Sequence, residues 1–155
     1  MTDFCQINKI LLRPIYPFEG SKRILESLTQ EDTYVAALGM LQGYFQVPLD
    51  EKTSWLTVFI SPWGKYRYSR APMGLSPSSD LLNAITSALV DGLVGIEKSM
   101  DDFLAHVSSI KALEGILRKF FDYCKKLGVK MSTKKFQTGT RVKFGGHIIN
   151  TRTMR

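Results

Sequence analysis

The sequence KSMDDFLAHVSSIKALEGILRKFFDYCKKLG at residues 98–128 combines a β-like run with the most regular helical pattern in the chain. From residue 110 onward, apolar residues recur every three or four positions, which is the period of a helix with one buried face. They are Ile110, Leu113, Ile116, Leu117, Phe120, Phe121, Cys124 and Leu127. Serines precede this segment, lysines fill its last turn, and Gly128 stands at the C-terminal cap. The pattern predicts a helix over residues 110–127.

Just upstream, Asp101 and Asp102 separate two β-capable runs at 93–100 and 103–107. A tight turn between the two strands would hold both carboxylates at the strand junction. Adjacent aspartates at a hairpin tip are most often ordinary turn residues. Carboxylates are also the ligands that Mg²⁺ prefers, and a two-metal phosphoryl-transfer site needs a third carboxylate nearby. Taken alone, the pair is compatible with either role.

Outside this stretch, short helices and strands alternate around hairpins. The sequence predicts an extended segment over 1–20, a helix over 21–32 capped by Ser21, a buried strand over 33–40, a hairpin of 53–62 with 65–72, a helix over 76–93, and a strand, turn and strand near the C-terminal end. In the helix over 76–93, the shared apolar face is Leu81, Leu82, Ile85, Ala88 and Leu89. This order predicts an α+β fold with an antiparallel sheet and helices packed on one face.

Composition limits the class of protein. With 155 residues and 44% hydrophobic content, the chain fits one globular domain with a real core. Its two cysteines, Cys5 and Cys124, lie far apart, which argues against structural zinc and favours a reducing compartment. No signal peptide and no run near the roughly 18 apolar residues of a membrane span are evident. We expect an intracellular protein, in the cytoplasm or nucleus, without membrane contact.

Positive charge is concentrated in the C-terminal quarter. The net charge is +7, from 21 basic and 14 acidic residues. Eleven of the basic residues, but only one acidic residue, Asp122, lie in 118–155, so the remainder of the chain is slightly acidic. This asymmetry is equally compatible with a solvated lysine-rich face and with a surface that binds a polyanion such as nucleic acid.

Several motifs occur in a defined order. They are DFCQINKILLRPIYPF (3–18), GYFQVPLDE (43–51), SPWGKYRYSRAPMGLSPSS (61–79), SMDD (99–102), LRKFFDYCKKLGVKMSTKKFQ (117–137) and VKFGGHIIN (142–150). Together they resemble the reverse transcriptases of gypsy-class LTR retrotransposons and retroviruses, over about residues 3–151. The resemblance implies a fingers–palm fragment, with partial fingers over 1–32, mainly palm over 33–155, and no thumb or ribonuclease H region.

The resemblance also implies roles for individual residues. Asp101 and Asp102 match the metal-binding aspartates of the palm hairpin. Tyr44 matches the aromatic residue that excludes the ribose 2′-hydroxyl, and Met73 and Gly74 match a stretch near the incoming nucleotide. The expected primer grip is Phe144, Gly145, Gly146 and His147, with His147 expected to be solvated rather than a metal ligand. The expected nucleic-acid surface is Lys125, Lys126, Lys130, Lys134, Lys135, Arg141 and Lys143.

Three functional positions depart from the family pattern. Gly39, in LGMLQGY (38–44), stands where the family has its third catalytic aspartate. Ser99 replaces the tyrosine before the aspartates, and Cys5 replaces an arginine. A glycine side chain cannot bind a cation, and neither Asp32 nor Asp50 lies at a spacing that replaces the lost carboxylate. The sequence therefore predicts a surviving fold whose chemistry is impaired.

Three functions remain open at this stage. The first is an active RNA-directed DNA polymerase that uses Mg²⁺ or Mn²⁺, a template–primer of RNA and DNA, and dNTPs. The second is a domesticated palm that binds nucleic acid without catalysis and without a metal cofactor. The third is a protein-interaction module that forms a homo-oligomer or pairs with the remaining domains of a polyprotein.

Overall fold

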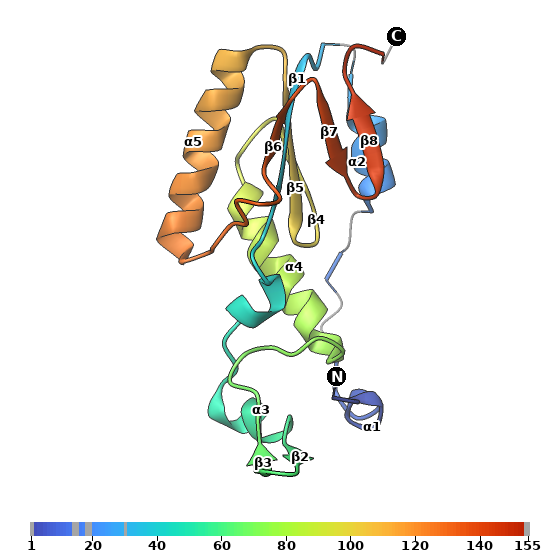
Figure 1. The fold of residues 1–155 in the computed structure, drawn as a ribbon, viewed down its shortest axis with the longest axis vertical. Coiled ribbons are helices and arrows are strands. Elements are labelled where there is room, and N and C mark those ends of the chain that lie inside the picture. The colour runs from blue at the N-terminus through green and yellow to red at the C-terminus, as the bar shows by residue number, and fades with distance from the viewer. Residues whose placement is uncertain (1, 14–15, 18–19, 30, 154–155) are drawn as a thin grey trace. The chain divides into compact units, whose positions relative to one another are not determined.

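The computed structural model describes residues 2–13, 16–17, 20–29 and 31–153, and these form two compact units (Figure 1). One unit contains the chain up to Tyr16 together with Gln42–Ala84. The other contains Pro17–Leu41 together with the chain from Ile85 onward. Helix α4 (Ser76–Val90) begins in the first unit and ends in the second.

A four-stranded antiparallel sheet in the order β4-β5-β1-β6 forms the centre of the second unit. Its strands are β1 (Tyr34–Gly39), β4 (Ile96–Ser99), β5 (Asp102–Val107) and β6 (Gln137–Gly139). The central pair, β1 and β5, aligns Tyr34 with Val107 at one end and Gly39 with Asp102 at the other. The predicted buried strand over 33–40 is thus confirmed as β1. The last residue of β1, Gly39, lies opposite Asp102 of the predicted metal site.

Both faces of this sheet are covered. On one face Phe103 packs against Phe120 of α5 (Ile110–Leu127), with ring centroids 4.8 Å apart. On the other, Leu104 joins a core cluster with α2 (Ser21–Ser27) and the hairpin of β7 (Arg141–Phe144) and β8 (His147–Asn150). Adjacent strand residues point to opposite faces, so the complete burial of Phe103 and Leu104 requires two covering layers. The predicted α+β fold with an antiparallel sheet is confirmed, but its helices are not confined to one face as predicted, because α2 packs on the face opposite α5.

Helix α5 occupies the range that its periodicity predicts. The Ser109 hydroxyl accepts the Ala112 N–H at 3.2 Å, and Gly128 adopts the left-handed conformation at the C-terminal cap. The buried stripe is narrower than the pattern predicts, because only one face of the helix meets the sheet. Its buried residues are Leu113, Ile116, Phe120 and Cys124, whereas Ile110, Phe121 and Leu127 are exposed.

The first unit contains short elements only. They are α1 (Cys5–Asn8), the 3₁₀ helix η1 (Gly43–Gln46), α3 (Glu51–Trp55), β2 (Phe59–Ser61), β3 (Gly64–Tyr66) and the start of α4. The extended prediction for 1–20 is wrong at residues 5–8, where the Asp3 carboxylate accepts the Cys5 N–H at 2.8 Å and starts a turn of helix. The strand prediction for 53–62 is wrong in its first part, because Asp50 caps α3 by accepting the Thr53 N–H at 3.0 Å.

Two further local predictions are wrong. Gly20, not Ser21, is the N-cap of α2, and this helix ends at Ser27. The apolar face predicted for α4 includes Leu81 and Ala88, which are both exposed. The polar residues Asp80, Asn83 and Thr86, spaced three apart, are buried instead. Leu82 and Leu89 of the predicted face are fully buried, so the inward side of α4 combines apolar and polar residues.

The neighbouring phenylalanines of α5 provide a matched test of the sheet–helix interface. We expect Phe120→Ala to lower the free energy of unfolding by about 3–5 kcal/mol, because it opens a cavity beneath Phe103. Phe121→Ala, at an exposed position, is expected to cost about 1 kcal/mol or less. Urea denaturation followed by circular dichroism measures both, and equal losses would contradict this packing.

Candidate functional site

The aspartate pair lies at the tip of the β4–β5 hairpin. Ser99 pairs with Asp102, and Met100 and Asp101 form the connection between the strands. Met100 adopts a left-handed backbone conformation with φ of 55°, which few non-glycine residues adopt outside tight turns. The Met40 N–H donates to the Asp101 carbonyl oxygen at 2.8 Å and fixes the turn at the end of β1. The predicted hairpin position of the pair is thus confirmed.

Gly39 lies directly opposite Asp102 across the β1–β5 ladder. A Cβ atom on residue 39 would lie 2.6 Å from Asp102 Oδ1 and 2.3 Å from Lys135 Cδ. The backbone of Gly39 is outside the left-handed region, so its conformation does not demand glycine. Residue 39 is therefore placed to complete a carboxylate cluster, and it contributes no side chain.

The side chain of Lys135 lies beside Gly39 and between the carboxylates of Asp101 and Asp102. Lys135 Nζ lies 3.1 Å from Asp102 Oδ1 and 3.3 Å from Asp101 Oδ2. Burial acts to lower the pKa of Lys135, but hydrogen bonds and charge attraction from Asp102 and Asp101 outweigh it, so the pKa lies above its ordinary value. The ammonium is therefore charged at neutral pH and bridges the two carboxylates.

The chain segment after α5 carries Lys135 to this place. The Leu41 N–H donates to the Lys130 carbonyl at 3.0 Å, and the Ser132 N–H donates to the Gly39 carbonyl at 2.8 Å. The Lys135 N–H in turn donates to the Ser132 carbonyl at 3.2 Å. These backbone hydrogen bonds tie residues 130–135 to the end of β1. They fix the position of the Lys135 backbone relative to the aspartates.

The aspartates that sequence spacing considered as substitutes have other roles. Asp32 pairs with His106, with Oδ1 and Nδ1 3.0 Å apart, and accepts the Thr29 N–H at 2.8 Å. Asp50 caps α3. Across the described ranges, no group of three or more His, Cys, Asp or Glu side chains is arranged to hold a metal ion. Two carboxylates bridged by an ammonium do not fit a pair of divalent ions, which need more oxygen ligands and no competing cation.

A cleft of about 300 Å³ extends from the aspartates to the β7–β8 turn. Its lining residues are Ala37, Leu38, Asp102, Lys134, Lys135, Gln137, Lys143, Phe144, Gly145 and Gly146. Three lysines face one aspartate in this lining, so its charge favours an anionic ligand such as a phosphodiester.

The predicted primer-grip residues divide into a buried part and an exposed part. Phe144 is buried in the core cluster and anchors the turn, whereas His147 is exposed, as expected for a solvated histidine. Gly145 and Gly146 have φ of 55° and 81°, a conformation that favours glycine. A Cβ atom on Gly145 would lie 2.3 Å from the Ser21 Cβ, so the turn approaches the start of α2 closely.

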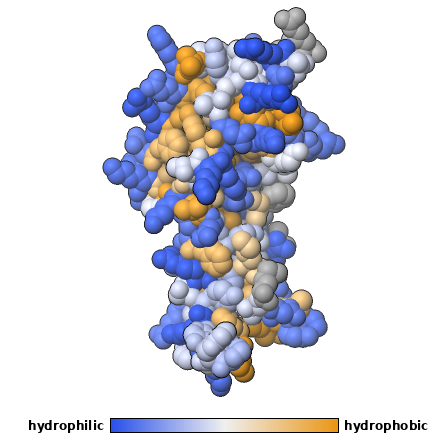
Figure 2. Space-filling model, in the orientation of Figure 1, coloured by the Kyte–Doolittle hydropathy of each residue, from blue (hydrophilic) through white to orange (hydrophobic). Residues whose placement is uncertain are grey.

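All seven basic residues of the predicted nucleic-acid surface are exposed. They are Lys125, Lys126, Lys130, Lys134, Lys135, Arg141 and Lys143. They come from the last turn of α5, from the segment that follows it, and from β7. In Figure 2, hydrophilic residues border an apolar band in the region of α5.

The predicted nucleotide-binding residues belong to the first unit, where hydrogen bonds hold Tyr44 and the backbone of Gly74. The Tyr44 hydroxyl lies 3.1 Å from Ser79 Oγ. The Asn8 side chain donates to the Gly74 carbonyl and accepts the Ser76 N–H, both at 2.8 Å. Gly74 has φ of 91°, so glycine suits this turn, while Met73 is half exposed. Asn8 thus fixes the shape of the loop that contains Met73 and Gly74.

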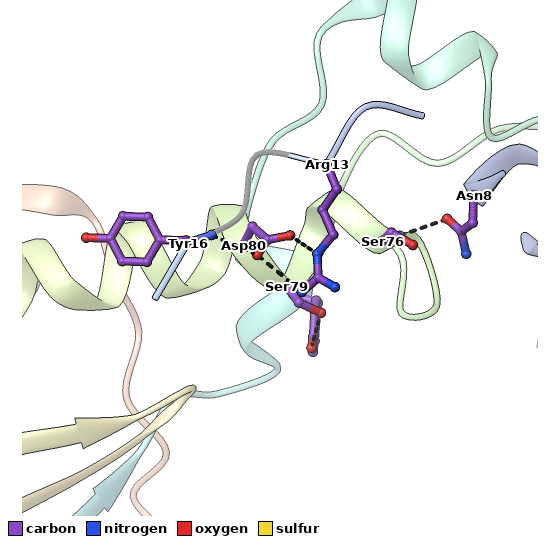
Figure 3. A network of polar contacts seen from close by, with 7 residues as sticks. Asn8, Arg13, Tyr16, Ser76, Ser79 and Asp80 are labelled. Carbon is purple, nitrogen blue, oxygen red and sulfur yellow. Dashed lines mark hydrogen bonds and ion pairs between the residues drawn. The ribbon is translucent and has the colours of Figure 1, made fainter. Parts of the chain in front are cut away.

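Sequence patterns did not identify Asp80, which is almost fully buried at the start of α4. Arg13 Nε donates to Asp80 Oδ2 at 2.6 Å, and the Tyr16 N–H donates to Oδ1 at 3.3 Å (Figure 3). The Arg13 hydrogen bond holds the pKa of Asp80 below its ordinary value, although burial acts to raise it. The sequence did contain a signal for a buried polar face of α4, because Asp80, Asn83 and Thr86 recur every three positions.

Comparison with known proteins agrees with this geometry. The family profile described as "Reverse transcriptase (RNA-dependent DNA polymerase)" matches residues 2–149. The chain belongs to the reverse transcriptase family. The retrovirus-related Pol polyprotein from transposon 412 of Drosophila melanogaster is 30% identical over 138 residues, which cover 86% of this chain and 11% of the relative. The curated relatives are much longer, and this reverse transcriptase-family chain spans 10–13% of their length.

Two solved structures of the foamy viral protease–reverse transcriptase show the same fold. One, in complex with RNA/DNA hybrid, has a TM-score of 0.89 at 24% identity and covers 96% of this chain and 20% of its own. The other, in complex with double-stranded DNA, has a TM-score of 0.90 at 24% identity and covers 97% of this chain and 26% of its own. Within the described part of this reverse transcriptase-family chain, no helix is both long and apolar enough to cross a membrane.

The ion pair between the exposed Arg13 and the buried Asp80 predicts a change in the acid stability of this reverse transcriptase-family chain. We expect Asp80→Asn to lower the free energy of unfolding by about 1–3 kcal/mol at neutral pH, because Arg13 loses its charged partner. A lowered folded-state pKa adds stability above the unfolded value of about 3.9, and that stability is lost as pH falls through the folded value. The difference between wild type and variant therefore shrinks below about pH 4.

Urea denaturation at pH 7, 5 and 3 measures this difference. Asp91→Asn, at an exposed residue just beyond α4, is the matched control and is expected to change stability little. A difference between wild type and Asp80→Asn that is the same at all three pH values would contradict the role given to Asp80.

Proposed function

We propose that this chain is a palm-containing domain of a retroelement Pol protein that binds template–primer nucleic acid and is impaired in nucleotidyl transfer. Residues 1–32 are assigned to partial fingers and 33–155 mainly to the palm. One observation carries the impairment: residue 39, directly across from Asp102, is a glycine, and the Lys135 ammonium bridges Asp101 and Asp102. Loss of one carboxylate weakens metal binding and removes transition-state stabilisation.

Two observations support nucleic-acid binding: the positive charge of the cleft and the structural similarity to foamy viral reverse transcriptases. The cleft beside the aspartates contains Lys134, Lys135 and Lys143, and the exposed basic surface continues along the end of α5. The structurally similar foamy viral enzymes are described in complex with RNA/DNA hybrid and with double-stranded DNA. The Pol polyproteins among the relatives support a place within a longer polyprotein.

Within this proposal each predicted residue has a limited role. Asp101 and Asp102 are the remaining members of a carboxylate cluster, and their partner is Lys135. Tyr44, Met73 and Gly74 form the nucleotide-facing surface, which Asn8 and Ser79 hold in shape. The Gly145–Gly146 turn, with His147 beside it, presents backbone and imidazole groups to a primer. The basic side chains contact phosphates.

Primer extension tests the proposed impairment. On an RNA template with an annealed DNA primer, we expect the wild-type chain to give no extension above background in Mg²⁺ or in Mn²⁺. The reason is that two carboxylates bridged by a lysine ammonium, with no third carboxylate beside them, do not assemble two metal ions. Extension by the wild-type chain would overturn the proposal, because it would show that two aspartates suffice.

Binding to the same template–primer tests the other half of the proposal. We expect the affinity to fall steeply with salt and to depend little on sequence. The double variant Lys134→Ala with Lys143→Ala is expected to reduce the slope of log K against log[salt] by about 2, roughly one unit for each phosphate contact removed. Fluorescence anisotropy from 50 to 300 mM KCl measures the slope.

Lys111→Ala is the matched control for this titration, since Lys111 is exposed at the opposite end of α5 from Lys125 and Lys126. An equal loss of slope in the control and in the double variant would mean that the cleft is not the binding surface. Binding that does not depend on salt would exclude phosphate contacts altogether.

A second candidate function is association with a protein partner, for which a second copy of this chain is the simplest case. An apolar groove of about 220 Å³ supports it, lined by Leu38, Phe121, Met131, Ser132, Thr133 and Phe136. Sedimentation velocity over a hundredfold concentration range decides whether this chain self-associates. A constant sedimentation coefficient would exclude the homo-oligomer.

A further inference from the structure

We infer that Lys135 is a built-in counterion that takes the place of a divalent cation at Asp101 and Asp102 and keeps the palm in a metal-free form. The inference rests on the proposed function, because it concerns the same incomplete carboxylate site. It goes beyond the loss of a ligand, since it assigns the exclusion of metal to a positively charged side chain of the chain itself.

The first argument is distance. Lys135 Nζ is within 3.3 Å of one oxygen of each aspartate, so a single ammonium serves both carboxylates. Charge-assisted hydrogen bonds of this kind orient both partners. Any cation that bridges the same two carboxylates would have to approach these oxygens, so it competes with the ammonium for space and for charge.

The second argument is volume. An ideal Cβ on residue 39 would lie 2.3 Å from Lys135 Cδ and 3.1 Å from Lys135 Nζ. The stem of the lysine thus fills the space in which a side chain at position 39 would begin. The observed position of the Lys135 side chain therefore requires glycine at residue 39. An aspartate at residue 39 fits only after the Lys135 side chain has moved.

The third argument is anchorage. Lys135 belongs to a segment whose backbone is bonded to Gly39 and Leu41 through Ser132 and Lys130. Its Cα therefore cannot retreat without breaking those bonds, and only rotation of the side chain can remove the ammonium. Restoring the carboxylate with Gly39→Asp alone is accordingly insufficient, and removal of the lysine charge is also required.

Titration of Mn²⁺, followed by electron paramagnetic resonance of the free ion, tests the inference. Changes in groups that contact the ligands of a metal typically alter its affinity by about 10- to 100-fold. We expect Lys135→Met to raise Mn²⁺ affinity about tenfold or more over wild type. Lys134→Met, which removes a neighbouring positive charge from the same cleft, is expected to raise it less than about threefold.

The restored carboxylate gives the second arm. Gly39→Asp combined with Lys135→Met is expected to bind Mn²⁺ about tenfold or more tightly than Gly39→Asp alone. Equal affinities of these two variants, or equal effects of Lys134→Met and Lys135→Met, would overturn the inference. If circular dichroism shows that Gly39→Asp is unfolded, the comparison of Lys135→Met with Lys134→Met alone tests the counterion role of Lys135.

These outcomes are separable from those that test the proposed function. Template–primer binding is measured on the same samples. Unchanged Mn²⁺ affinity in Lys135→Met, together with salt-dependent template–primer binding by the wild-type chain, overturns the counterion role only. Primer extension by the wild-type chain overturns the proposed impairment, whatever the Mn²⁺ titrations show.

Discussion

The pairing of β1 with β5 is the constraint on which the rest of the second unit depends. Both strands lie in the middle of the sheet, and eight of their twelve residues are buried because α5 covers one face while α2 and the β7–β8 hairpin cover the other. A shift of one residue would exchange the two faces and place Phe103 where Leu104 packs. The register is therefore rigidly specified, and it places residue 39 opposite Asp102.

The sequence was most informative where one physical signal dominated. The 3.6-residue period of α5, with Ser109 and Gly128 at its ends, predicted that helix, and the apolar run before it predicted β5. The ordered motifs predicted the family, and the hairpin position of Asp101 and Asp102 followed from the two runs beside them. In each case local chemistry and tertiary packing favour the same conformation.

Prediction failed where distant partners decide the structure. Nothing near Asp80 in the sequence indicates that Arg13 will pair with it, so the predicted inward face of α4 wrongly included Leu81 and Ala88. The role of Asn8 depends on a loop 66 residues away. Lys135 appeared only as one lysine in a basic segment, because its contact with the aspartates depends on the backbone path after α5.

The left-handed turn at Met100 and Asp101 has a consequence for how such domains are classified. The Met40 N–H bonds the backbone carbonyl of Asp101, which any residue would offer, and Lys135 contacts both carboxylates, so these contacts hold the pair in place without a third carboxylate. An intact Asp-Asp pair therefore does not by itself identify a complete carboxylate cluster. The residue that faces the second aspartate across the central ladder must be read together with that signature, and in this chain it is a glycine.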